Sequence, residues 1–172
     1  MFKRTQQGAL GTMRANPHCL PEIKGIVMDI EVERRMAAAP ATVAEIMFDP
    51  DHDPSWIGGA KAVERLSPDP HRIGARVRRT GGFLGKRFSW VTELAEYVPD
   101  HLMRMRFVEG PMKGEVTYRI EPNGDGSRVF IRNSGGSSFT VPGVGLMLRR
   151  SVGKDLERLE QLIATERRNG TD

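Results

Sequence analysis

The chain has 172 residues, of which 38% are hydrophobic and 28% charged, with a formal net charge of +4 at pH 7. This composition is typical of a globular protein, and no stretch approaches the roughly 20 apolar residues of a membrane span. The first residues hold no apolar run behind their charges, which argues against a secretory signal. Cys19 is the only cysteine, so an intrachain disulfide is excluded and a reducing, cytoplasmic location is expected.

The basic charge is concentrated at the start of the chain. Residues 1–28 carry a net charge of +3, which leaves only +1 for residues 29–172. In this longer part arginines alternate with glutamates instead of forming one basic stripe, as a nucleic-acid-binding surface would require. The sequence therefore predicts a mixed, solvated surface and no nucleic-acid partner.

Residues 1–27 differ from the rest because they mix glycine and proline with polar residues and show no periodic pattern. A flexible N-terminal tail is expected here. Met13 and Met28 are both possible internal start sites, so the segment is also a candidate start-site extension. The folded domain is predicted to span residues 28–172.

Residues 28–36 alternate between apolar and polar side chains, which predicts a half-buried strand. A helix follows at Pro40, which suits a first helical turn, and Thr42 with Glu45 has capping-box spacing. Residues 49–54 end this helix, with Asp53 before Pro54 as the expected N-cap of a second short helix.

Six more strands are predicted between turn signals rich in glycine, proline, asparagine and aspartate. Their ranges are 62–66, 73–80, 86–97, 101–109, 114–121 and 128–133. The connections are short, so successive strands should pair antiparallel. The last element is an amphipathic helix over 145–168, whose apolar residues recur every three or four positions: Leu148, Val152, Leu156, Leu159 and Ile163. This order predicts an α+β domain in which a seven-stranded curved antiparallel sheet wraps around a long C-terminal helix, with two short helices between strands 1 and 2.

One helix covers only the centre of a strongly twisted sheet, so an apolar pocket is expected between them. Strand alternation and the short helices give candidate ligand-binding residues, for which ordinary core packing is the alternative. They are Trp56, Val77, Phe88, Trp90, Met103, Met105, Phe107, Met112, Val116, Tyr118 and Met147.

Several segments resemble the START-like (SRPBCC) superfamily, specifically its polyketide cyclase/dehydrase-like branch. They include Ile30-Glu31-Val32, Asp53-Pro54-Ser55-Trp56, Gly74-Ala75-Arg76-Val77 and the Tyr118–Pro122 strand end, with the terminal helix completing the set. The resemblance covers residues 28–168 and rests on diffuse motifs. It implies a helix-grip fold that binds hydrophobic small molecules such as lipids, polyketides, sterols or quinones, in members that range from cyclases to non-catalytic carriers.

Candidate catalytic residues are polar side chains that strand parity turns inward. Arg79 and Tyr118 could polarise a carbonyl group, and Glu109 could act as a desolvated carboxylate. The alternatives are a rim ion pair or solvent exposure for Arg79 and Glu109, and core packing for Tyr118.

No metal and no cofactor are expected. The four histidines lack metal-ligand spacing, and Gly81–Gly85 leads into a strand, so it cannot hold phosphate at a helix start. The acidic run at 49–53 resembles a calcium loop but has Pro54 where that loop requires glycine.

The favoured hypothesis is a binding or carrier protein for a hydrophobic small molecule with a ring or an acyl chain. A cofactor-independent cyclase or dehydratase using Tyr118, Arg79 and Glu109 is the first alternative. The second is a lipid or quinone chaperone at a membrane surface, which would use the basic tail and Arg149-Arg150 for a weak contact with anionic headgroups.

Overall fold

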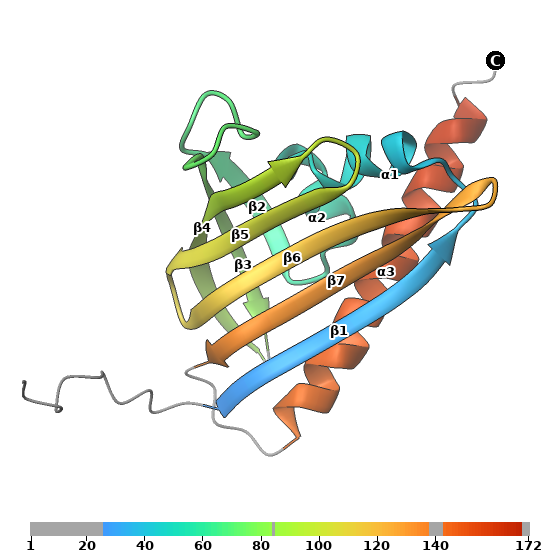
Figure 1. Cartoon of the computed structure of the whole chain (residues 1–172). Helices are drawn as coiled ribbons and strands as arrows, with labels where there is room; N and C mark the ends of the chain where they lie inside the picture. The colour runs from blue at the N-terminus through green and yellow to red at the C-terminus, as the bar shows by residue number, and fades with distance from the viewer. Residues whose placement is uncertain (1–25, 84, 138–142, 170–172) are drawn as a thin grey trace, which may run out of the picture.

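In the computed structural model, which describes residues 26–83, 85–137 and 143–169, seven strands form one curved sheet around a long helix (Figure 1). The strands are β1 (Ile26–Met36), β2 (Ala60–Arg65), β3 (Arg76–Phe83), β4 (Lys86–Val98), β5 (Leu102–Glu109), β6 (Met112–Asn123) and β7 (Gly126–Ser137). The helices are α1 (Pro40–Met47), the short 3₁₀ helix η1 (Pro50–His52), α2 (Asp53–Trp56) and α3 (Val144–Asn169).

The strand order is β1-β7-β6-β5-β4-β3-β2, and every neighbouring pair is antiparallel. Strands β2 to β7 follow one another through short connections, and β1 lies beside β7. The predicted α+β helix-grip architecture, with two short helices after the first strand, is therefore confirmed.

The element boundaries differ from the predicted ones in a few places. Strand β1 begins at Ile26, two residues before the expected start of the domain. Residues 1–25 lie outside the described residues, so the flexible tail stays a prediction. The capping box at Thr42 is wrong: Ala39 is the N-cap of α1 and makes no side-chain cap bond, with Pro40 at the first helical position.

Helix α3 buries the predicted apolar stripe, since Val152, Leu156, Leu159 and Ile163 are all buried against the sheet and the short helices. It contacts α1, α2 and β1. Helices α1 and α2 pack at one end of the concave face and contact α3 (Figure 1). No helix of the described residues is long and apolar enough to cross a membrane.

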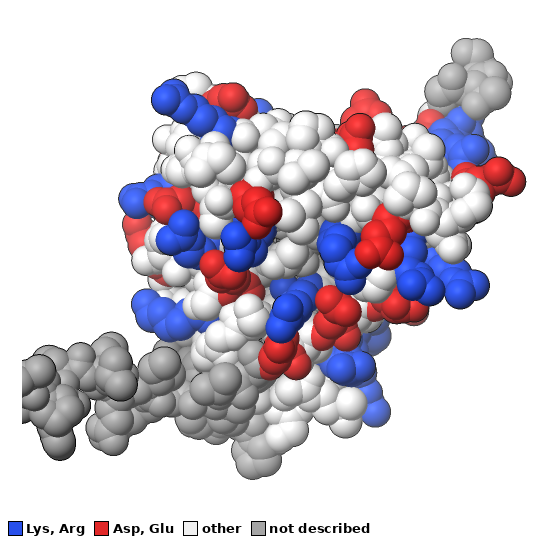
Figure 2. Space-filling model, in the orientation of Figure 1, with Lys and Arg blue, Asp and Glu red and all other residues white. Residues whose placement is uncertain are grey.

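The outer face of the sheet explains the alternation of arginines and glutamates. Neighbouring strands carry ion pairs such as Arg104–Glu96, Arg78–Glu64 and Arg132–Asp29, with N–O distances of 2.6–2.8 Å. Figure 2 shows acidic and basic side chains interspersed over this face. The surface that β1 and β4–β7 present here is thus mixed in charge, as predicted.

Replacing Leu156 with alanine should lower the free energy of unfolding by roughly 2–5 kcal/mol, because Leu156 is fully buried between α3 and the sheet. Urea denaturation measures the loss. Leu146→Ala on the same helix is the control, since Leu146 is 56% exposed and its truncation should change stability little. Equal losses in the two variants would contradict this packing.

Candidate functional site

A cavity of about 180 Å³ lies between the concave face of the sheet and α3. Strands β3 to β7 supply one wall, α3 supplies the other, and Trp56 and Ile57 of the α2 region also line it. A cavity of about 150 Å³ with apolar walls is large enough to hold benzene. The observed space therefore suits a ring compound better than a long folded lipid.

Most of the predicted ligand-binding residues line this cavity, called here the pocket. They are Trp56, Phe88, Trp90, Met105, Phe107, Met112, Val116 and Tyr118. Strand alternation placed them correctly, because side chains two residues apart on a strand share one face. The rings of Phe88 and Trp90 are in contact, with centroids 5.5 Å apart, as are those of Trp56 and Tyr118 at 5.7 Å.

Three predicted ligand-binding residues lie elsewhere. Val77 and Met103 face inward but line a second cavity of only about 10 Å³ near Phe48 and Pro50. Arg79, Thr92 and Met105 line both cavities and so separate them. Met147 does not line the pocket, because it lies on the outer side of the first turn of α3 and is 39% exposed.

Glu109 is exposed and does not line the pocket, which corrects its proposed inward position. The cause is a register shift in the β4–β5 pair: Phe107 lies opposite Thr92, but Glu109 lies opposite the adjacent residue, Val91. This bulge adds one residue to β5 and breaks the alternation on which the prediction depended. Phe107 faces the pocket with Thr92, whereas Glu109 aligns with the opposite face.

Arg79 is buried and paired, neither on a rim nor in solvent. Its side chain is only 4% exposed and Asp53 only 1%, and Arg79 Nε donates to Asp53 Oδ2 at 2.6 Å. Arg79 Nη1 donates to Thr92 Oγ1 at 2.6 Å, and that hydroxyl contacts Met105 Sδ at 3.7 Å. These contacts form the inner end of the pocket, because Arg79, Thr92 and Met105 separate it from the second cavity.

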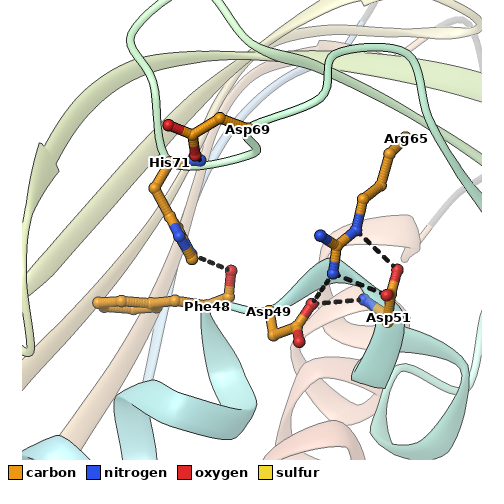
Figure 3. A network of polar contacts seen from close by, with 6 residues as sticks. All are labelled: Phe48, Asp49, Asp51, Arg65, Asp69 and His71. Atoms are coloured by element: carbon orange, nitrogen blue, oxygen red, sulfur yellow. Dashed lines mark hydrogen bonds and ion pairs between the residues drawn. The ribbon is translucent and has the colours of Figure 1, made fainter.

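Asp53 is the first residue of α2 and not its N-cap, which is His52. Its carboxylate is buried in the protein interior. Burial raises the pKa of Asp53 to about 6, against the opposing effect of Arg79, and the charges of Asp49 and Asp51 raise it further. Those two carboxylates lie outside, where Arg65 binds both at 2.7 Å (Figure 3). The acidic run therefore separates into two surface groups and one buried group.

Two hydrogen-bond donors beside the pocket have no partner among the described residues. The indole Nε1 of Trp56 is buried and unpaired, and none of the described hydrogen bonds involves the Tyr118 hydroxyl. Burial raises the pKa of Tyr118, with the charge of Asp53 acting in the same direction. The phenol is therefore protonated and available to donate a hydrogen bond to an oxygen atom.

Asp155 is a pocket residue that the sequence analysis missed. Its carboxylate accepts from the Gly58 backbone N–H at 3.0 Å and pairs with Arg158. Burial raises the pKa of Asp155, while the Gly58 bond and Arg158 act in the opposite direction. The signal was present in the sequence: Asp155 lies three residues after Val152 and four before Leu159, within the apolar stripe of the helix. Thr92 was recognisable in the same way, since it shares strand parity with Trp90.

The described residues contain no group of three or more histidine, cysteine, aspartate or glutamate side chains suited to a metal ion. The expectation of no cofactor stays a prediction. The buried polar side chains that line the pocket are Arg79, Thr92, Tyr118 and Asp155.

The sequence profile of the family described as "Polyketide cyclase / dehydrase and lipid transport" matches residues 28–164. The chain belongs to this family. A search of curated proteins gives no match to the sequence. The family match confirms the expected resemblance to the SRPBCC-type proteins.

Solved structures share the fold at low sequence identity. The protein TTHA0849 from Thermus thermophilus superposes with a TM-score of 0.70 at 20% identity, over 81% of this chain and 99% of that one. The Zhui aromatase/cyclase from Streptomyces sp. R1128 gives 0.69 at 14% identity, over 81% and 94%. Ara h 8.0201 gives 0.61 at 14% identity, over 81% and 99%. At these identities the likeness shows the helix-grip fold alone.

Replacing Arg79 with methionine should destabilise the protein strongly, by about 3–5 kcal/mol near pH 8, because Asp53 is left buried without a counter-charge. The folded-state pKa of Asp53, about 6, is above its ordinary value of 3.8. The fold thus favours the protonated carboxyl, and this stabilisation is lost as the pH rises through 6. The loss in Arg79→Met should therefore be smaller near pH 5, as urea denaturation at both pH values would show.

The double variant Asp53→Asn with Arg79→Met removes both charges and should recover part of the lost stability near pH 8. A loss in Arg79→Met that is the same at both pH values, with no recovery in the double variant, would contradict a buried charge pair.

Proposed function

We propose that this protein binds a hydrophobic, ring-containing small molecule in the pocket and acts as a binding or carrier protein. The observation that carries the proposal is an apolar cavity of about 180 Å³ with unpaired donors at its inner end. Aromatic and methionine side chains supply the apolar contacts, and the family description, which covers cyclases, dehydrases and lipid transport, is consistent with such a ligand.

The donors define the polar part of the ligand. Tyr118 lines the pocket with a free hydroxyl, and Arg79 lines it while using Nε and Nη1 for Asp53 and Thr92. A buried donor without a partner costs about 1–3 kcal/mol, which a ligand oxygen would recover. We therefore expect a carbonyl or hydroxyl oxygen on the ligand. A cytoplasmic location stays a prediction that rests on the single cysteine.

A substitution that fills the pocket tests the binding function. Leu148 of α3 lines the pocket, so Leu148→Trp should abolish the bound mass that native mass spectrometry is expected to show on gently purified protein. Leu146→Trp is the matched control, because Leu146 is exposed on the same helix and lies outside the pocket. The same apolar adduct on both variants, or none on the parent protein, would contradict the proposal.

A cofactor-independent cyclase or dehydratase is the second candidate, and the raised pKa of Asp155 within the pocket favours it. In an aldol cyclisation a base removes a proton beside one carbonyl, and donors stabilise the negative charge that develops on oxygen. Asp155 is the buried lining carboxylate for the first task, and Tyr118 and Arg79 are donors for the second. Glu109 no longer belongs to this set, because it lies outside the pocket.

If the protein is such an enzyme, Tyr118→Phe should reduce turnover by about 10²–10³-fold, as expected for the loss of one oxyanion donor, and should lower ligand affinity by a smaller factor. The loss of a linear poly-β-ketone substrate, followed by absorbance, measures turnover. Glu109→Gln is the control and should retain full activity. Reduced turnover in Glu109→Gln with normal turnover in Tyr118→Phe would assign the chemistry to a different part of the molecule.

A further inference from the structure

Five cationic side chains at one end of the sheet have no ion-pair partner among the described residues. They are Lys86 and Arg87 at the β3–β4 hairpin, Lys113 at the start of β6, and Arg149 and Arg150 in the first turns of α3. Each of the five is exposed. This contrasts with the outer face of the sheet, where arginines such as Arg104 and Arg132 are paired with carboxylates.

Two exposed apolar side chains lie among these cations. Leu146 is 56% exposed and Met147 39%, and both precede Arg149 and Arg150 on the same two turns of α3. Their exposure is a feature of the helix start only, since the stripe from Val152 to Ile163 is buried. The five cations together with Leu146 and Met147 are called here the mouth surface.

The mouth surface lies at the more open end of the pocket, where Lys113 lines it. The pocket residues at this end, such as Phe88, Met112 and Leu148, are partly exposed, whereas Tyr118 and Trp56 at the other end are buried. The β3–β4 and β5–β6 hairpins and the start of α3 gather at this end of the molecule (Figure 1). Glu109 at the end of β5 and Glu115 of β6, which pairs with Arg104 and Arg106, are the acidic side chains near the β5–β6 hairpin, so cations predominate.

We infer that the mouth surface docks on an anionic lipid bilayer, with Leu146 and Met147 entering the interface and the five cations contacting headgroups. The inference goes beyond ligand binding, because it concerns what the outside of the pocket touches. Unpaired cations alone would suit any acidic partner. Exposed apolar side chains interleaved with cations suit a surface that has both anionic groups and an apolar layer beneath them. A ligand could then pass between bilayer and pocket without crossing water.

Vesicle sedimentation of the full-length protein tests this inference. Binding is expected to vesicles with about 30% phosphatidylserine in phosphatidylcholine, and not to pure phosphatidylcholine. It should weaken at least about tenfold between roughly 50 and 500 mM salt, since the contact is electrostatic. The charge reversal Arg149→Glu with Arg150→Glu should lower binding at least about tenfold, and Leu146→Ser with Met147→Ser should also weaken it.

The matched control is Arg35→Glu with Arg168→Glu, which changes the net charge equally at the ends of β1 and α3 that lie away from the mouth. This control should bind nearly as well as the parent protein. Equal losses in the two charge reversals, or unchanged binding after reversal at Arg149 and Arg150, would overturn the inference.

Equally strong binding to soluble polyaspartate, unaffected by Leu146→Ser with Met147→Ser, would assign the surface to an acidic polypeptide and overturn the inference too. Native mass spectrometry of the Arg149→Glu, Arg150→Glu variant should still show the pocket ligand, which separates docking from binding.

Discussion

The ion pair between Asp53 and Arg79 joins α2 to β3 inside the concave face of the sheet, and the pocket depends on it in two ways. Arg79, with Thr92 and Met105, separates the pocket from the small second cavity, so the pair sets the depth to which a ligand can enter. It also keeps a cation beside an apolar space that would otherwise exclude one, because a buried charge is tolerated only when it is paired and hydrogen-bonded. Asp53 is held in this buried position because it is part of α2, which gives this four-residue helix a structural role.

Charge is distributed unevenly over the described surface of the molecule. On the outer face of the sheet, each strand places arginines opposite carboxylates of its neighbours, and the fields of such pairs largely cancel beyond a Debye length of about 8 Å in physiological salt. Around the pocket opening, cations such as Arg149 and Arg150 have no ion-pair partner among the residues that the structure describes. The small net charge of residues 29–172 therefore conceals a strong difference in local charge between the outer face of the sheet and the pocket opening. The average charge of the sequence argues against a nucleic-acid stripe, but it cannot show a basic surface assembled from two hairpins and a helix start.

The fold was predictable because it depends on local patterns: strand alternation, turn residues between strands and the apolar stripe of α3. The pocket walls followed from the same alternation. The sequence prediction was wrong where the tertiary structure changes which residues of a strand share a face or brings distant residues together. The β5 bulge separates Glu109 from the face of Phe107, and no turn signal marks it. The Asp53–Arg79 pair joins residues 26 positions apart, so neither side chain alone indicated it. Asp155 is a different case, since a carboxylate within an apolar helical stripe was visible and its meaning was overlooked.

The two ends of the pocket impose different requirements on a ligand. At the inner end, Tyr118 is a neutral donor and Arg79 a cation already engaged by Asp53, so a single oxygen atom suits the site better than a second full negative charge. At the outer end, the free cations can attract a negative charge, but they are solvated and screened by salt. A compound with a neutral oxygen-bearing ring inside and any charged group outside satisfies both ends. Reversing that orientation would bury a charged group against Trp56 and Val116, where Arg79 is already engaged by Asp53 and the neutral donors offset only part of its desolvation. Under the proposed binding function, the pocket would therefore select the direction in which a ligand enters as well as its apolar character.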